Sequence, residues 1–535
     1  MLRDMVVFAI FAVGLPISFR KPFFGLMLFS WLAYMRPQDL CWGPARDFRF
    51  SFYTALALYA GYGIFEFRRG LGRKDLRNYF LVGLFIFVGI SIPYGETQFE
   101  RQYERYIELG KILLMASLTT TLVDTEKRMR LIVWTIAVSL GFYGVKGGIF
   151  GAQGGRIIEG PGGLILDNND FGLAMVMNLP LLFYLSKETN RPRVRMALLF
   201  ACLLTVITIV VTKSRGAFLA TTAVFAITVW KSEKRAMGFG LGFLAAIVFV
   251  IFMPEDYRAR LSTIREGKDE SAAARLVAWE CAIRMAAANP VTGVGFYNFR
   301  SSYWKYNPDP LLVPGKIVTH NSYLQVWSET GSFALLCFLG LLFYSIFRCF
   351  RIRALVKGRG DLKWADYYAN AFQLSLIGYM IGATFLNRAH FDLFYQIVAL
   401  TVALDILVRE RLQAPEAGAH QHFGAPGHFA VRTGSPFLRP LREAWVGGRA
   451  LAKAALSWRP GLRQPSWPVE SKARPAPEKQ VTWPKPANGR QERSDDGGSA
   501  KWPTRRRLRF EVRRDEEEGG QRPTAWPVRP TGARR

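Results

Sequence analysis

Thirteen apolar segments within residues 1–408 constrain the fold of this chain more than any other feature. A helix needs roughly 20 apolar residues to span a bilayer, and about 17 can suffice. The segments are 5–19, 22–36, 52–67, 79–94, 107–123, 130–150, 169–186, 196–212, 215–230, 236–253, 325–348, 368–387 and 391–408. The first two are short and meet between Pro16 and Pro22, so they form either two spans or one shallow hairpin. The pattern predicts an all-α polytopic membrane protein with 12–13 transmembrane helices.

Basic residues predict how this chain is oriented, because Lys and Arg collect in the cytoplasmic loops of membrane proteins. The basic loops are 68–77, 127–130, 191–195, 231–235 and 348–357. They alternate with loops of low charge. This alternation predicts that the long polar loop 254–324 lies on the extracytoplasmic face. The side of the N-terminus stays open, because Arg20 and Lys21 favour a cytoplasmic position for the first turn.

The same features divide the chain into four parts. These are N-terminal transmembrane helices at 1–253, an extracytoplasmic loop at 254–324, C-terminal transmembrane helices at 325–410, and a basic cytoplasmic tail at 411–535. The tail is rich in Pro, Arg, Gly and Ala, and such a composition predicts disorder. The part from Arg409 onward supplies +13 of the net charge of +29. Most of the remainder belongs to the topology signal and to headgroup contacts, so the charge does not imply nucleic-acid binding.

Loop 254–324 holds the residues that point to chemistry. His320 is one of only two histidines before the tail, and an imidazole there predicts proton transfer. A helix is expected from 272 to 288, with Ser271 as its N-cap and an apolar face formed by Leu276, Trp279 and Ile283. Arg275 lies one turn before Trp279 and shares its side, whereas Arg284 points elsewhere. The alternative is a helix on the membrane surface with both arginines solvated.

Three shorter segments add candidates. In the tight connection before span 215–230, Lys213 fits snorkelling to headgroups, whereas Arg215 opposes the helix dipole and fits the gripping of phosphate. The glycine-rich segment 147–163 is expected to be a mobile loop. Asp167 and Asp170 follow it, and they either bind a metal, act as a base, or lie beside a helix cap at Asn168 or Asn169. His390, before the last span, either assists a site or orients its turn.

The motifs taken in order resemble the O-antigen ligase and polymerase superfamily, whose members are bacterial inner-membrane glycosyltransferases. The resemblance rests on Ser214-Arg215-Gly216 at a helix start, Arg275 with Trp279, Gly293-Val294-Gly295, and His320-Asn321 before an apolar segment. The N-terminal segment looks like that of a narrower subgroup, the O-glycosylation ligases associated with exosortase A systems. That likeness rests on Leu-Pro-Ile-Ser (15–18), Trp-Leu-Ala-Tyr-Met-Arg-Pro (31–37) and Trp42-Gly43.

The resemblance implies a reaction and its residues. Arginines matching Arg215 and Arg275 hold the diphosphate of an undecaprenyl-diphosphate-linked glycan, and the histidine matching His320 acts on the acceptor hydroxyl. Transfer is implied to invert the anomeric centre, with no metal and no cofactor, in a site facing the periplasm. The acceptor is a protein, lipid A–core or another saccharide. The candidate substrate-binding residues are Lys213, Arg215, Arg275, Trp279 and Asn321.

Two alternatives stay open. In a polymerase of the same superfamily, the acceptor is another lipid-linked repeat, and the residues do not separate this from a ligase. A transporter for glycolipid would be expected to have ionisable residues at mid-membrane or inverted repeats. The chain has few of the former and no visible repeat, so the ligase interpretation is favoured.

Overall fold

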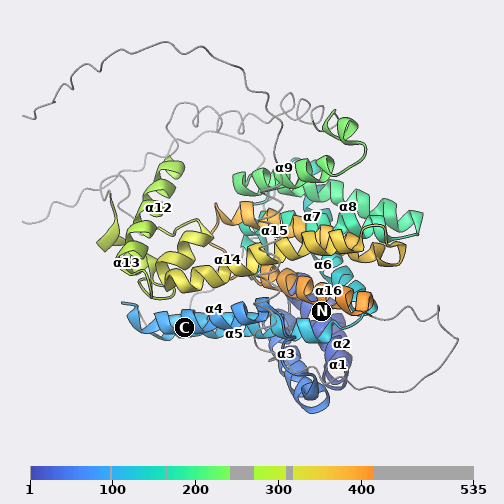
Figure 1. Cartoon of the computed structure of the whole chain (residues 1–535), viewed down its shortest axis with the longest axis horizontal. Coiled ribbons are helices and arrows are strands. Elements are labelled where there is room, and N and C mark those ends of the chain that lie inside the picture. The colour runs from blue at the N-terminus through green and yellow to red at the C-terminus, as the bar shows by residue number, and fades with distance from the viewer. Residues whose placement is uncertain are drawn as a thin grey trace, which may run out of the picture. The chain divides into compact units, whose positions relative to one another are not determined.

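The computed structural model describes residues 2–96, 99–163, 165–240, 242, 270–308 and 317–413. Most of them lie in helices (Figure 1). The helices before the long loop are α1 (Leu2–Arg20), α2 (Pro22–Tyr34), α3 (Phe50–Gly61), α4 (Leu76–Ser91), α5 (Phe99–Leu122), α6 (Glu126–Ala152), α7 (Asn168–Glu188), α8 (Pro192–Val211) and α9 (Arg215–Trp230). Those from the loop onward are α12 (Glu270–Ala288), α13 (Phe299–Tyr306), α14 (Ser322–Val356), α15 (Lys363–Ala383) and α16 (Asp392–Gln413).

The predicted fold class, an all-α polytopic membrane protein, is confirmed. Among the described residues, five helices are long and apolar enough to cross a membrane, namely α1, α4 with the short helical turn after it, α6, α8 and α14. The helices α2 and α9 are apolar but shorter. Each expected span corresponds to a described helix except 236–253, most of which lies outside the described residues, as do 254–269, 309–316 and the tail from 414. One small departure from the all-α class is an antiparallel hairpin of β1 (Glu159–Gly162) and β2 (Ile165–Asp167).

The helices bring two sets of connections together at opposite ends of the bundle. At one end, which we call the His320 end, the Asp4 carboxylate accepts hydrogen bonds from the backbone N–H groups of Gly43 and Ala45, at 3.0 and 3.3 Å. The N-terminus therefore lies at this end, a point that the charges of Arg20 and Lys21 left open. At the other end, the Arg77 end, residues of the basic loops contact helix ends: Arg73 donates to Glu410 at 3.0 Å, and Arg130 donates to Glu188 at 2.8 Å. The alternation of basic and weakly charged loops thus corresponds to two ends of the bundle.

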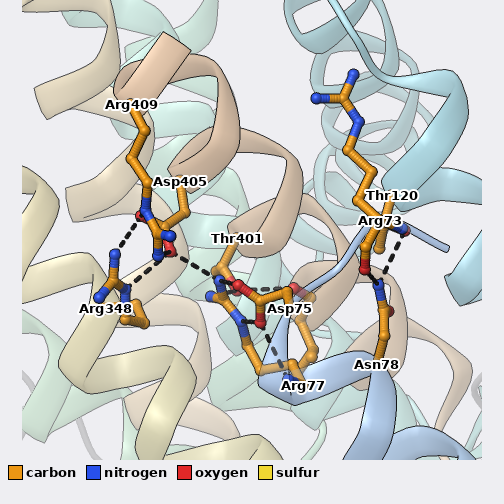
Figure 2. Close-up of polar contacts among 10 residues, drawn as sticks. Arg73, Asp75, Arg77, Asn78, Thr120, Arg348, Thr401, Asp405 and Arg409 are labelled. Atoms are coloured by element: carbon orange, nitrogen blue, oxygen red, sulfur yellow. Dashed lines mark hydrogen bonds and ion pairs between the residues drawn. The ribbon is translucent and has the colours of Figure 1, made fainter. Parts of the chain in front are cut away.

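Polar contacts at the Arg77 end join helices that are far apart in sequence. Arg77 is fully buried, donates to Asp75 at 2.7 and 2.8 Å, and also donates to Asp405 at 2.9 Å and to Thr401 at 3.1 Å. Figure 2 shows Arg348 and Arg409 converging on the same Asp405 carboxylate. These contacts tie the start of α4 to α14 and α16.

The glycine-rich segment 147–163 does not have the structure expected of it. Its first part continues α6 to Ala152, and the glycines there let α8 approach closely. A Cβ at Gly147 would lie 2.8 Å from Cγ2 of Thr208, and one at Gly148 would collide with the Leu204 carbonyl. The Thr208 hydroxyl donates across this contact to the Gly144 carbonyl at 2.5 Å. The remaining residues include β1, which pairs with β2, so much of the segment has regular secondary structure.

Helix α14 is broken near its start, which the apolar pattern did not predict. Gly331 has φ 82° and ψ −179°, a conformation essentially restricted to glycine. A Cβ there would collide with the Val291 carbonyl. The segment after α12 satisfies the backbone groups that the break frees: Val294 N–H donates to the Ser328 carbonyl, and Ser332 N–H donates to the Pro290 carbonyl, both at 2.8 Å. The first glycine of the Gly293-Val294-Gly295 motif also meets this backbone, and a Cβ there would lie 2.6 Å from the Ser328 carbonyl oxygen.

A buried carboxylate reinforces the contact between the loop and α14. Glu329, about two turns into the broken helix, accepts a hydrogen bond from the backbone N–H of Phe299 at 3.2 Å. Phe299 is the first residue of α13, so Glu329 satisfies one of the N–H groups that a helix start leaves without an intrahelical partner. Figure 1 shows α12 and α13 beside this first part of α14. The described part of the long loop is therefore anchored to a membrane helix by backbone and side-chain bonds.

Candidate active site

His320 lies immediately before α14 in a strained backbone position. Its φ is +48°, in the left-handed region that few residues other than glycine adopt. The residues beside it are fixed on the turn between α15 and α16. The Thr319 hydroxyl donates to the Asn387 side-chain oxygen at 2.7 Å, and the Ser322 hydroxyl donates to the Leu386 carbonyl at 2.7 Å. The neighbours on both sides thus fix the backbone at His320, and a group that must meet a reacting atom requires such positioning.

The charges around His320 come from two other parts of the chain. Burial lowers the pKa of His320 below its ordinary value of 6.5, the positive charge of Arg275 lowers it further, and the negative charge of Asp167 opposes this. Both side chains are therefore close enough to act on the ring electrostatically. The lowered pKa keeps the imidazole neutral at pH 7, the form that can accept a proton.

Arg275 is half-buried on α12, whereas Arg284 lies on the exposed side and donates to Glu280 at 2.6 Å. The helical spacing predicted this separation. Two other expectations for the helix were wrong. It begins at Glu270, so Ser271 lies within its first turn and is not its cap. The face that packs on α13 is not the predicted one: Leu276 is 63% exposed and Ile283 46% exposed. The residues packed there are Val277, Ala278, Cys281, Ala282 and Met285.

Trp279 lies one turn after Arg275 and is half-buried. Its indole N–H is buried and has no hydrogen-bond partner among the described residues. A buried donor without a partner is costly and uncommon. The indole is therefore available to an acceptor from outside the described part of the chain.

Asp167 has a structural role as well as an electrostatic one. It is the N-cap of α7, and its carboxylate accepts from the backbone N–H of Asn169 at 2.8 Å. The cap is thus Asp167, and not Asn168 or Asn169 as expected. Asn168 instead donates to the Thr212 carbonyl at 2.8 Å. That bond joins the start of α7 to the turn that carries Lys213 and Arg215.

Arg215 is the first residue of α9, as predicted, and its side chain is exposed. Ser214 caps the helix by accepting from the backbone N–H of Ala217. Lys213 has φ +54°, so this turn, like the segment at His320, holds a non-glycine residue in the left-handed region. A Cβ at Gly216 would lie 3.2 Å from the Cβ of Phe385. Phe385 belongs to the turn between α15 and α16, which Thr319 and Ser322 contact on either side of His320. The start of α9 and His320 therefore flank the same turn.

Asn321 acts as the N-cap of α14. Its side-chain oxygen accepts from the backbone N–H groups of Tyr323 and Leu324, at 3.0 and 3.1 Å. This oxygen is thus committed to the helix, and Asn321 contributes to the site mainly by fixing the residue before it.

An ion pair between Asp170 and Arg388 completes the surroundings, and sequence reasoning did not assign it. Arg388 donates to the Asp170 carboxylate across 218 residues of sequence. No local signal in the sequence pairs Arg388 with Asp170, because the two are so far apart along the chain. His390 itself packs edge-on against Phe296, with ring centroids 5.2 Å apart, and burial together with Arg388 lowers its pKa to about 4. The contact with Phe296 favours the interpretation that His390 orients the turn.

Comparison with known families agrees with this part of the chain. Residues 200–339 match the model of a family described as O-antigen ligase, and the match includes α9, α12, His320 and the broken part of α14. Residues 2–187 match a family of unknown function (DUF5935). No curated protein matches the chain. The narrower exosortase-associated subgroup has no support beyond the motifs that resemble it. Residues 200–339 therefore support the O-antigen ligase superfamily, and with it glycosyl transfer of the ligase or polymerase type.

Proposed function

We propose that this chain transfers a preassembled glycan from an undecaprenyl-diphosphate carrier to an acceptor hydroxyl at the His320 end. The observation that carries the proposal is a half-buried imidazole, neutral at pH 7, with an arginine and a carboxylate acting on it from separate elements. This set lies partly within the segment that matches the O-antigen ligase family. The proposed site faces the periplasm of the bacterial inner membrane, because the basic loops lie at the opposite end of the bundle.

In the proposed step, the acceptor oxygen attacks the anomeric carbon of the sugar. His320 takes the hydroxyl proton as the new C–O bond forms. The bond from the anomeric carbon to the phosphate oxygen breaks, and the diphosphate leaves with the electron pair. Arg275 and Arg215 stabilise its negative charge, since a guanidinium group matches two phosphate oxygens at once. Trp279 offers its indole donor to the same ligand.

The class of activity is tested by reconstituting the full chain in liposomes with an undecaprenyl-diphosphate-linked oligosaccharide and a candidate acceptor. We expect release of undecaprenyl diphosphate together with a glycosylated acceptor. Lengthening of the glycan on the carrier itself would instead identify a polymerase. Movement of the glycolipid between leaflets without bond cleavage would contradict the proposal and identify a transporter.

The positive charge of Arg275 and the negative charge of Asp167, which both act on His320, predict opposite shifts in the pH dependence of transfer. The rate should rise with pH as the imidazole loses its proton, with a midpoint below pH 6.5 because the pKa is lowered. Arg275→Gln removes a positive charge and should raise the midpoint. Asp167→Asn removes a negative charge and should lower it, while asparagine keeps the helix cap. Initial rates from pH 4.5 to 8.5 measure both.

Direct titration of the His320 imidazole by NMR in the same variants provides the control. Arg284→Gln, a change of the same type on the exposed side of α12, should leave the midpoint unchanged. Shifts in the same direction for Arg275→Gln and Asp167→Asn would contradict the assignment of His320 as the titrating base.

A further inference from the structure

A cavity separate from the His320 ring lies between α2, α3, α5 and the start of α16. Its volume is about 340 Å³, within the range of small-molecule sites. Apolar side chains line most of it, and they are Phe29, Phe52, Ala55, Leu56, Ile112 and Met115. A smaller cavity of about 140 Å³ shares Tyr34, Ser51 and Asp392 with it and continues towards Arg36.

The cavity opens towards the surroundings of the bundle along α3. Phe52 is 51% exposed and Leu56 is 56% exposed, and they follow one another at helical spacing. This stripe begins at the His320 end, where α3 starts, and runs inwards. The apolar part of a bound molecule would therefore lie along the helix, with its polar part at the His320 end.

Lys111 is an unusual member of the lining. It lies four residues, or about 6 Å of helix, inside the expected span 107–123. Its side chain is exposed, and no described carboxylate forms an ion pair with it. A cation within a span is costly unless it meets a partner of opposite charge, and such a residue is by default a functional candidate.

Gln396 provides a second, independent sign of a ligand. It is 5% exposed, lines the cavity, and its Oε1 is 3.2 Å from the Thr119 hydroxyl. Its Nε2 is buried and has no hydrogen-bond partner among the described residues. The single hydroxyl proton of Thr119 is also shared with the Met115 carbonyl. Either orientation of the carboxamide therefore leaves one polar atom of Gln396 without a described partner.

We infer that this cavity binds one anionic glycerophospholipid. Its phosphodiester would pair with Lys111, its glycerol region would meet Gln396 and the hydroxyls of Ser51 and Tyr59, and one acyl chain would lie along α3. The charges of the lining residues support this occupant. One lysine matches the single negative charge of a phosphodiester. Asp392, in the same lining, disfavours a carrier diphosphate, because a diphosphate has a higher negative charge. The inference is independent of the proposed glycan transfer.

Native mass spectrometry of the full chain tests the inferred lipid site. The chain is incubated with phosphatidylglycerol and then released from detergent. We expect wild-type protein to retain one lipid molecule. Lys111→Gln should reduce the affinity about tenfold, since it removes one charge-assisted contact. Ala55→Trp, which fills the cavity, should abolish retention. Ala60→Trp, on the same helix and exposed outside the cavity, should bind as wild type does.

Equal retention by wild type, Lys111→Gln and Ala55→Trp would mean that only non-specific surrounding lipid is carried, and would overturn the inference. Stronger retention of undecaprenyl diphosphate than of phosphatidylglycerol, measured in parallel, would also overturn it by identifying the carrier as the occupant. Neither outcome depends on transfer activity. The lipid site and the proposed function can therefore fail separately.

Discussion

Replacing His320 with alanine is expected to lower the rate of glycan transfer by about 10²–10⁴-fold, the usual contribution of a general base. Because the residue has φ +48°, alanine also adds backbone strain. His320→Asn is therefore the sharper variant, since asparagine tolerates the left-handed region while lacking a group that can take the proton. Both are measured as initial rates in the reconstituted transfer assay.

Four controls separate lost chemistry from lost structure. The variants should be produced in normal amounts, and the melting temperature of His320→Asn should stay close to that of wild type. Added imidazole should restore part of the rate to His320→Ala. Arg284→Ala, which removes an exposed pair with Glu280 on the same loop, should keep the wild-type rate. Wild-type transfer by His320→Asn would rule out the base assignment.

Replacing Asp405 with alanine is expected to destabilise the chain by about 3–5 kcal/mol, as removing one partner of a buried ion pair usually does. Asp405 is fully buried and accepts hydrogen bonds from Arg77, Arg348 and Arg409 (Figure 2). Without it, Arg77 would keep its hydrogen bonds to Asp75 and Thr401 but lose its ion pair with α16. The melting temperature of the detergent-solubilised chain measures the effect.

Asp361→Ala is the matched control, because Asp361 also accepts two hydrogen bonds from one arginine, Arg359. Both partners are exposed, and such a surface pair contributes about 0.2–1 kcal/mol. A loss of stability no larger in Asp405→Ala than in Asp361→Ala would show that the buried cluster does not hold the helices together.

The transmembrane architecture could be predicted from the sequence because burial in a bilayer requires long apolar segments, and these are visible one by one. Helix starts such as Arg215 and helix ends such as Ala288 follow from local residues. The break at Gly331 could not be predicted, because it depends on a backbone contact with Val291 and Pro290 across the loop. Gly147 and Gly148 are predicted to lie in a loop only because α8, the helix that packs on them, lies more than 40 residues away in the sequence.

The candidate site also has features that could be predicted from the sequence and features that could not. Spacing on one helix separates Arg275 from Arg284, and His320 is conspicuous because histidine is rare in this chain. The grouping of Arg275, Asp167 and His320 depends on three elements meeting, which no local pattern contains. The pair of Asp170 and Arg388, and that of Arg77 and Asp405, join residues hundreds of positions apart. Arg215 is exposed, and its role at the diphosphate stays a prediction for mutagenesis.

The break in α14 has a consequence for engineering. Amide and carbonyl groups of the membrane helix are satisfied by residues 290–294, so the extramembrane segment is not an interchangeable module. A chimaera that grafts a foreign segment between α12 and His320 would leave those backbone groups without hydrogen-bond partners in a place with little water. Swapping acceptor preference between relatives would therefore require a cut beyond Ser332, so that the segment and the helix it completes travel together.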